Sequence, residues 1–146
     1  DTDRSRGLGD VYKRQEYDYY TTTKGILEKV KTHAGDVDFE VPPELLSLFS
    51  NRDFGRYAGE KGEMNVCFIS NNDITGGNSG SAMFNARGEL LGLAFDGNWE
   101  AMSSDILYEP KMQRCIGVDV RYILFMIEKY GKAGNLIREL KIVSGK

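Results

Sequence analysis

A loop of small residues at positions 76–81 (GGNSGS) is the segment best suited to covalent chemistry. A nucleophilic serine needs an exposed hydroxyl at a sharp turn, small neighbours, and backbone N–H groups aimed at the developing oxyanion. Gly77 and Gly80 flank Ser79, and glycine tolerates the backbone angles that such a turn requires. The N–H groups of Gly77 and Ser79 could then form an oxyanion hole. Spacing alone leaves a second interpretation open, because Asn-Ser-Gly between strands is often only a turn.

Short apolar segments on both sides of this loop predict antiparallel strands, followed by a C-terminal helix. Residues 85–88 (NARG) have the composition of a tight hairpin turn between two of these strands. Pro42 and Pro43 are expected to begin a short helix, and Asp119 to cap the C-terminal one. The predicted strands are residues 17–28 with a bend at Gly25, 65–70, 81–85, 89–95 and 115–118, and residues 135–143 add a last helical turn or two.

The composition is that of a single globular domain of 146 residues, 40% of them hydrophobic and 28% charged. Nineteen Lys and Arg against 22 Asp and Glu give a net charge of −3, which argues against binding nucleic acid or an anionic membrane through bulk charge. No apolar run approaches the length of a membrane span. Two cysteines and one histidine are too few for a structural zinc site, and we expect neither a metal nor a cofactor.

Residues 1–15 (DTDRSRGLGDVYKRQ) have no apolar periodicity and no signal-peptide core. They also resemble a translated sequencing-adapter artefact, so we expect a non-native leader; an ordinary polar arm is the alternative. On the first interpretation the chain is a fragment whose natural sequence continues upstream, and the missing signal peptide says nothing about location.

Residues 71–100 resemble the catalytic-serine region of the bacterial serine dipeptidyl-peptidases, types 7 and 11. Ala82 departs from that pattern, since the family more often has proline after Ser-Gly-Ser, but this position affects a strand start rather than the chemistry. The likeness spans about residues 17–142 and includes segments 19–22, 66–69, 105–106, 118–122 and 123–125.

This resemblance implies a mostly β fold, part of a chymotrypsin-like double β-barrel. Residues 16–146 would be the C-terminal part of the catalytic domain, with the end of the second barrel and a C-terminal helix. Ser79 falls on the family's nucleophile and Gly77 on its oxyanion-hole glycine. The catalytic His and Asp lie upstream in the first barrel, and His33, the only histidine here, has no catalytic counterpart. Because an unactivated serine is close to an ordinary alcohol, we expect the isolated chain to be inactive.

The resemblance also implies how a substrate is chosen. Asp96 matches a position that helps to hold the free amino terminus of the peptide, which a carboxylate can do through charge-assisted hydrogen bonds; a turn aspartate is the alternative. At Gly97 the family has arginine where the P1 residue is acidic, whereas glycine leaves room for an apolar one. The parent protein is therefore expected to release dipeptides with a hydrophobic P1 residue.

Two other functions stay open at this point. Asp73 lies six residues before Ser79, the spacing at which trypsin-like endopeptidases place the carboxylate that attracts Lys or Arg. A non-catalytic peptide-binding module with a protease-like fold is the other alternative. The resemblance further implies an exported bacterial protein, periplasmic or at or beyond the cell surface, whose parent could form a homodimer.

Four side chains have undecided roles. Phe95 and Trp99 could line the substrate cleft or pack beneath a loop. Cys67 and Cys115 both lie on predicted strands, so they could form a disulfide if those strands are neighbours, or remain buried free thiols.

Overall fold

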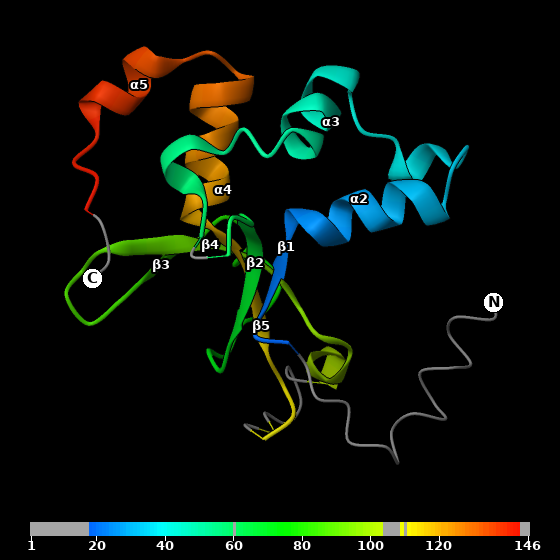
Figure 1. The fold of residues 1–146 in the computed structure, drawn as a ribbon. Coiled ribbons are helices and arrows are strands. Elements are labelled where there is room, and N and C mark those ends of the chain that lie inside the picture. The colour runs from blue at the N-terminus through cyan, green and yellow to red at the C-terminus, as the bar shows by residue number, and fades with distance from the viewer. Residues whose placement is uncertain (1–17, 60, 104–108, 110, 144–146) are drawn as a thin grey trace.

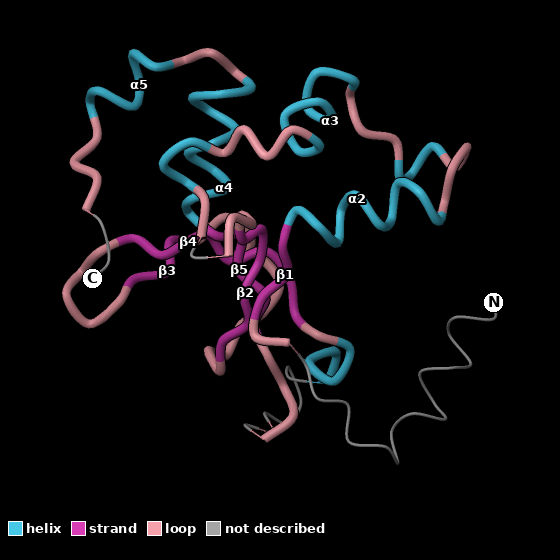
Figure 2. The backbone as a smooth tube through the Cα atoms, in the orientation of Figure 1, coloured by secondary structure: helices cyan, strands magenta, loops and turns pink. Residues whose placement is uncertain are grey.

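Five strands form one antiparallel sheet in the computed structural model, which describes residues 18–59, 61–103, 109 and 111–143. The strand order is β1-β2-β5-β4-β3. Helices gather on one side of this sheet, while a short helix at residues 99–103 lies at its opposite end (Figures 1 and 2). The sheet and the helices that follow β5 confirm the predicted fold class, although helices take up more of the chain than we expected. None of the helices within the described ranges is long and apolar enough to cross a membrane.

The strands are short and most helices have fewer than three turns. The strands are β1 (Tyr20–Thr22), β2 (Asn65–Ser70), β3 (Ala82–Phe84), β4 (Leu90–Gly97) and β5 (Cys115–Asp119). The α-helices are α2 (Thr23–Thr32), α3 (Pro43–Ser50), α4 (Val120–Phe125) and α5 (Gly134–Glu139). The 3₁₀-helices are η2 (Val37–Phe39), η3 (Gly55–Tyr57) and η4 (Trp99–Ser103), and η5 (Met126–Tyr130) is a π-helix.

The prediction of one strand over residues 17–28 is wrong. Only β1 is extended, and the chain turns directly into α2 at Thr23. The Thr23 side chain is fully buried, and its N–H donates to the Met64 carbonyl at 3.0 Å. Ile26 and Leu27 then pack against the helical core. Tertiary burial has overridden the strand preference of the β-branched and aromatic run. The predicted leader, residues 1–15, lies outside the described residues.

Two hydrophobic clusters hold the chain together. The larger one is formed by helices and the segments between them, and its buried members are Leu45, Phe49, Phe54, Tyr57, Met64, Leu124, Phe125 and Ile137. The smaller one lies on the sheet and joins Met83, Ala94 and Cys115, with Phe68 and Ile74 packed against it. The smaller cluster therefore anchors the loop after β2 to β3, β4 and β5.

The two cysteines lie on neighbouring strands but are free thiols. Cys67 faces Val118 across the ladder, whereas Cys115 faces Ser70. Three residues of offset along a strand correspond to roughly 10 Å, which is too far for a disulfide. Burial raises the pKa of both thiols, so both stay protonated near neutral pH.

Asp119 ends β5 and caps α4, as the sequence predicted. Its Oδ1 accepts a hydrogen bond from the Arg121 N–H at 2.9 Å. The Arg121 guanidinium also binds both carboxylate oxygens, with Nε 2.9 Å from Oδ1 and Nη2 2.6 Å from Oδ2. Because Asp119 is buried, removing its carboxylate leaves the Arg121 N–H at the start of α4 without its cap. The Arg121 guanidinium would also lose this carboxylate partner.

Replacing Asp119 with alanine should lower the free energy of unfolding by about 1–2 kcal/mol, the usual cost of losing an N-cap. Asp119→Asn keeps a cap acceptor but loses the ion pair, so it should cost less. Urea unfolding of the chain measures both variants. An Asp119→Ala variant as stable as the starting chain would show that this cap contributes nothing.

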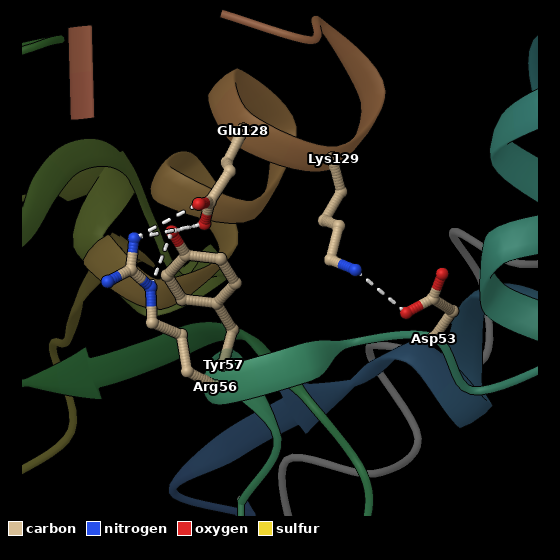
Figure 3. A network of polar contacts seen from close by, with 5 residues as sticks. All are labelled: Asp53, Arg56, Tyr57, Glu128 and Lys129. Atoms are coloured by element: carbon tan, nitrogen blue, oxygen red, sulfur yellow. Dashed lines mark hydrogen bonds and ion pairs between the residues drawn. The ribbon is translucent and has the colours of Figure 1, made fainter. Parts of the chain in front are cut away.

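A polar network ties the segment before β2 to η5 (Figure 3). Arg56 Nη2 lies 3.1 Å from both oxygens of Glu128, and the Tyr57 hydroxyl donates to the same carboxylate. Lys129 Nζ binds Asp53 Oδ1 at 2.9 Å. The Tyr57 hydrogen bond, supported by Arg56, holds the pKa of Glu128 below its usual range.

A lowered pKa in the folded state stabilises the fold above the unfolded-state pKa, and this stabilisation is lost as the pH falls through the folded pKa. Glu128→Gln should therefore lower the urea midpoint at pH 7, and the difference from the starting chain should shrink toward pH 3. Glu139→Gln, at an exposed position on α5, is the matched control for replacing a glutamate with glutamine. A Glu128→Gln difference that is equal at both pH values would contradict the argument.

Candidate active site

Residues 71–81, called the serine loop below, connect β2 to β3 through two successive turns. Gly77 and Gly80 have φ angles of +97° and +85°, the left-handed region that favours glycine. Asn78 holds the turns together, since its N–H donates to the Thr75 carbonyl at 3.2 Å and its Oδ1 accepts from the Thr75 N–H at 2.8 Å. The Ser81 N–H donates to the Asn78 carbonyl at 2.9 Å. The glycine positions thus meet the backbone requirement predicted from the sequence.

The end of the serine loop is hydrogen-bonded to β4. The Gly80 N–H donates to the Ala94 carbonyl at 2.7 Å, and the Ala94 N–H donates to the Ser81 carbonyl at 2.8 Å. These bonds bring Ser79, which is exposed, next to β4, where its Oγ lies 3.5 Å from the carbonyl oxygen of Phe95. Among the described residues the hydroxyl therefore has one long hydrogen-bond contact, and Ser79 is accessible to a substrate.

Some backbone amides of this loop are hydrogen-bonded within the protein and others are free. Those of Asn78, Gly80 and Ser81 donate within the protein. Within the described part of the chain, the N–H groups of Gly77 and Ser79 donate to no acceptor. Those two N–H groups are the pair that the sequence analysis assigned to an oxyanion hole, and both remain available to an outside acceptor.

A pocket of about 230 Å³ lies between the serine loop and the end of β4. It brings together three of the four predicted site residues, Ser79, Asp96 and Gly97; Gly77 is not among its walls, although both of its neighbours are. The described residues that line it are Ile74, Thr75, Gly76, Asn78, Ser79, Ala94, Phe95, Asp96, Gly97, Asn98 and Ala101.

A change of register in β4 shapes this wall. The pairing of β4 with β5 shifts between Ala94 and Asp96, so Phe95 has no partner in that ladder. Such a bulge redirects side chains and is common beside active sites. The Phe95 ring is 59% exposed and lines the pocket, which favours the cleft role considered above. Trp99, 65% exposed, is not among the described lining residues.

Asp96 and Gly97 lie side by side at the end of β4 that is remote from the start of α4. The exposed Asp96 accepts a hydrogen bond on Oδ1 from the Gly97 N–H at 2.8 Å, which restrains the carboxylate. A Cβ atom built on Gly97 would lie 2.8 Å from the Cβ of Ala101, closer than real Cβ contacts. The absence of a side chain at position 97 is therefore required by the turn that follows it.

His33 and Asp73 do not line this pocket. The His33 ring stacks on Phe39 at 4.1 Å, and its Nδ1 lies 2.9 Å from Thr32 Oγ1, so it belongs to the end of α2. The His33 side chain is half-buried. Asp73 is exposed, and the wall is formed instead by the next residue, Ile74.

Sequence reasoning missed Asn98, Ala101 and Ile74 as pocket residues. Asn98 is only 8% exposed, and its amide group bridges Met112 and Arg114. A polar residue directly after Gly97 was the only available signal, since contacts between distant backbone segments leave no local pattern.

The chain matches a known protein family. The family model described as Peptidase S46 matches residues 9–142, a range that begins inside the predicted leader. Dipeptidyl-peptidase 7 of Porphyromonas endodontalis is 57% identical over 129 residues, covering 88% of this chain and 15% of that protein. An Asp/Glu-specific dipeptidyl-peptidase of Capnocytophaga gingivalis is 48% identical over 127 residues, covering 87% and 18%.

Solved structures give the same result. The crystal structure of Porphyromonas endodontalis DPP11 in complex with the dipeptide Arg-Glu superposes with a TM-score of 0.81 at 42% identity. The match covers 87% of this chain and 18% of that one, so the chain spans less than a fifth of these relatives. On the extent of the family match and the identity to these enzymes, the chain belongs to the peptidase S46 family.

Proposed function

We propose that the parent protein is a serine dipeptidyl-peptidase that releases dipeptides from the free N-terminus of oligopeptides. Residues 16–146 would then be the C-terminal part of its chymotrypsin-like catalytic domain. The observation that carries this proposal is the pocket lined by Ser79, Asp96 and Gly97, together with the N–H groups of Gly77 and Ser79, which have no acceptor among the described residues. The names of the two dipeptidyl-peptidases compared above support the same activity.

In this mechanism the Ser79 Oγ attacks the carbonyl carbon of the second peptide bond, between P1 and P1′. A histidine supplied by the upstream part of the protein accepts the hydroxyl proton, and an aspartate orients that histidine. The carbonyl oxygen becomes an oxyanion and accepts hydrogen bonds from the N–H groups of Gly77 and Ser79. One such donor contributes about 3–4 kcal/mol to the stability of the transition state. The protonated amine leaves, and water hydrolyses the acyl-enzyme.

Asp96 is the residue that we assign to the substrate amino terminus. Its Oδ1 is occupied by the Gly97 N–H, and within the described residues its Oδ2 has no donor. A free α-ammonium could therefore bind Oδ2 through a charge-assisted hydrogen bond. Fixing the amino terminus at a set distance from Ser79 would select dipeptides over other lengths.

The pocket favours an apolar P1 side chain. Gly97 adds no charge or bulk to the wall, and Ile74 and Ala101 present hydrocarbon to the same space. Burying a Leu or Phe side chain in such surroundings contributes about 1.5–3 kcal/mol. A trypsin-like preference for Lys or Arg is disfavoured, because Asp73 lies outside the described pocket wall.

The location and the oligomeric state of the parent protein are inferred without support from the geometry of the pocket. We propose export to the periplasm or to the outside of a bacterial cell, and a homodimeric parent, on the family resemblance alone. Cell fractionation and sedimentation of the full-length protein measure these two properties.

Replacing Ser79 with alanine in the full-length parent should lower kcat/KM for dipeptide release by at least about 10⁴-fold, because the nucleophile is lost. Ser81→Ala, in the same loop, is the matched control and should stay active. Release of a fluorophore from dipeptide amides with a free amino end measures both.

Persistent cleavage by the Ser79→Ala variant would reject the assignment of the nucleophile. Cleavage of amino-blocked substrates with Lys or Arg at P1 would favour a trypsin-like endopeptidase. Binding of peptides by the unsubstituted protein without any cleavage would favour a non-catalytic module.

A further inference from the structure

Ala101 occupies the space that a side chain at position 97 would need. The Cβ built on Gly97 would lie 2.8 Å from the Ala101 Cβ and 4.0 Å from Ile74 Cδ1. The φ angle of Gly97 lies outside the left-handed region, so its backbone would accept an ordinary residue. Space, rather than backbone conformation, is what requires glycine here. The size of the side chain at position 101 therefore limits the size of the side chain at position 97, and the reverse also holds.

The turn that carries Ala101 is held firmly against the segment before β5. The Asn98 N–H donates to the Arg114 carbonyl at 2.9 Å, and Asn98 Oδ1 accepts from the Arg114 N–H at 2.8 Å. Asn98 Nδ2 donates to the Met112 carbonyl at 2.8 Å. The Ala101 N–H in turn donates to the Asn98 carbonyl at 2.9 Å. Because Asn98 is buried and both its amide oxygen and its amide nitrogen are hydrogen-bonded, moving the turn to admit a larger residue would break buried hydrogen bonds.

Ala101 also lines the same pocket as Ser79, Asp96 and Gly97. A group attached at position 101 would therefore extend either toward residue 97 or into the space where the substrate side chain is expected. Methylene groups added to a residue that lines a narrow apolar pocket weaken the binding of a large substrate side chain more than that of a small one.

We propose that Ala101 is a second specificity-determining residue, which together with Gly97 sets the size of the P1 side chain that the enzyme accepts. This inference rests on the proposed dipeptidyl-peptidase activity. The two residues act through the combined volume of their side chains. A larger side chain at position 101 narrows the pocket. A side chain at position 97 is tolerated only when the methyl group of Ala101 is removed.

The test uses the full-length parent and free-ended dipeptide amides that differ only at P1, with Ala, Leu or Phe. Ala101→Leu should lower kcat/KM for the Leu and Phe substrates at least about tenfold more than for the Ala substrate. Ala86→Leu, an equal enlargement in the exposed β3–β4 turn, should leave these ratios unchanged.

A second comparison does not depend on the tolerance of the fold for leucine. Gly97→Ala should lower kcat/KM at least about tenfold for all three substrates, and adding Ala101→Gly should restore most of the loss. If Ala101→Leu left the P1 ratios unchanged, with no loss or with an equal loss on all three substrates, the role of Ala101 would be overturned. The absence of rescue in the double variant would also overturn it. Failure of the unsubstituted parent to release any dipeptide would instead reject the proposed function itself.

Discussion

Two backbone hydrogen bonds between the serine loop and β4 are the constraint on which the rest of the site depends. The bonds from Gly80 to Ala94 and from Ala94 to Ser81 fix the loop in one register on the strand. That register places the Ser79 hydroxyl next to the carbonyl oxygen of Phe95. It also places Ser79 in the lining of the same pocket as Asp96 and Gly97. The proposed nucleophile and the residues proposed to recognise its substrate come from positions nearly twenty apart in sequence, and this pairing is what brings them to one pocket.

The smaller hydrophobic cluster stabilises the pairing of the serine loop with β4. Met83, Ala94 and Cys115 come from three adjacent strands, and Ile74 packs on them from the serine loop. Gly97 pairs with Cys115 at the opposite end of β5 from Asp119, where α4 begins. The helical layer and the pocket therefore lie at different ends of the same strand.

Much of this arrangement could be predicted from local sequence. The β3–β4 hairpin, strand β2, the helix after Pro42 and the cap at Asp119 all have short-range signals in residue type and spacing. The glycine turn around Ser79 was likewise predictable, because positive φ angles at Gly77 and Gly80 follow from a local steric rule. Family resemblance, rather than spacing, supplied the roles proposed for Asp96 and Gly97.

Features set by distant contacts could not be predicted in the same way. Residues 23–28 have strand-forming types, yet Thr23 is drawn to Met64 and the chain coils into α2. The state of the two cysteines depended on a register between β2 and β5 that no local pattern encodes. The contact between Gly97 and Ala101 depends on how Asn98 is held by Met112 and Arg114.

The most direct measurement of the central claim is mass spectrometry of the full-length parent after treatment with a fluorophosphonate. Attack by an activated serine Oγ on phosphorus expels fluoride and leaves a stable adduct on that residue alone. The account predicts an adduct on the peptide that contains Ser79, which a dipeptide substrate with a free amino end should suppress. An adduct on a different serine, or none in a preparation that cleaves peptides, would contradict the account.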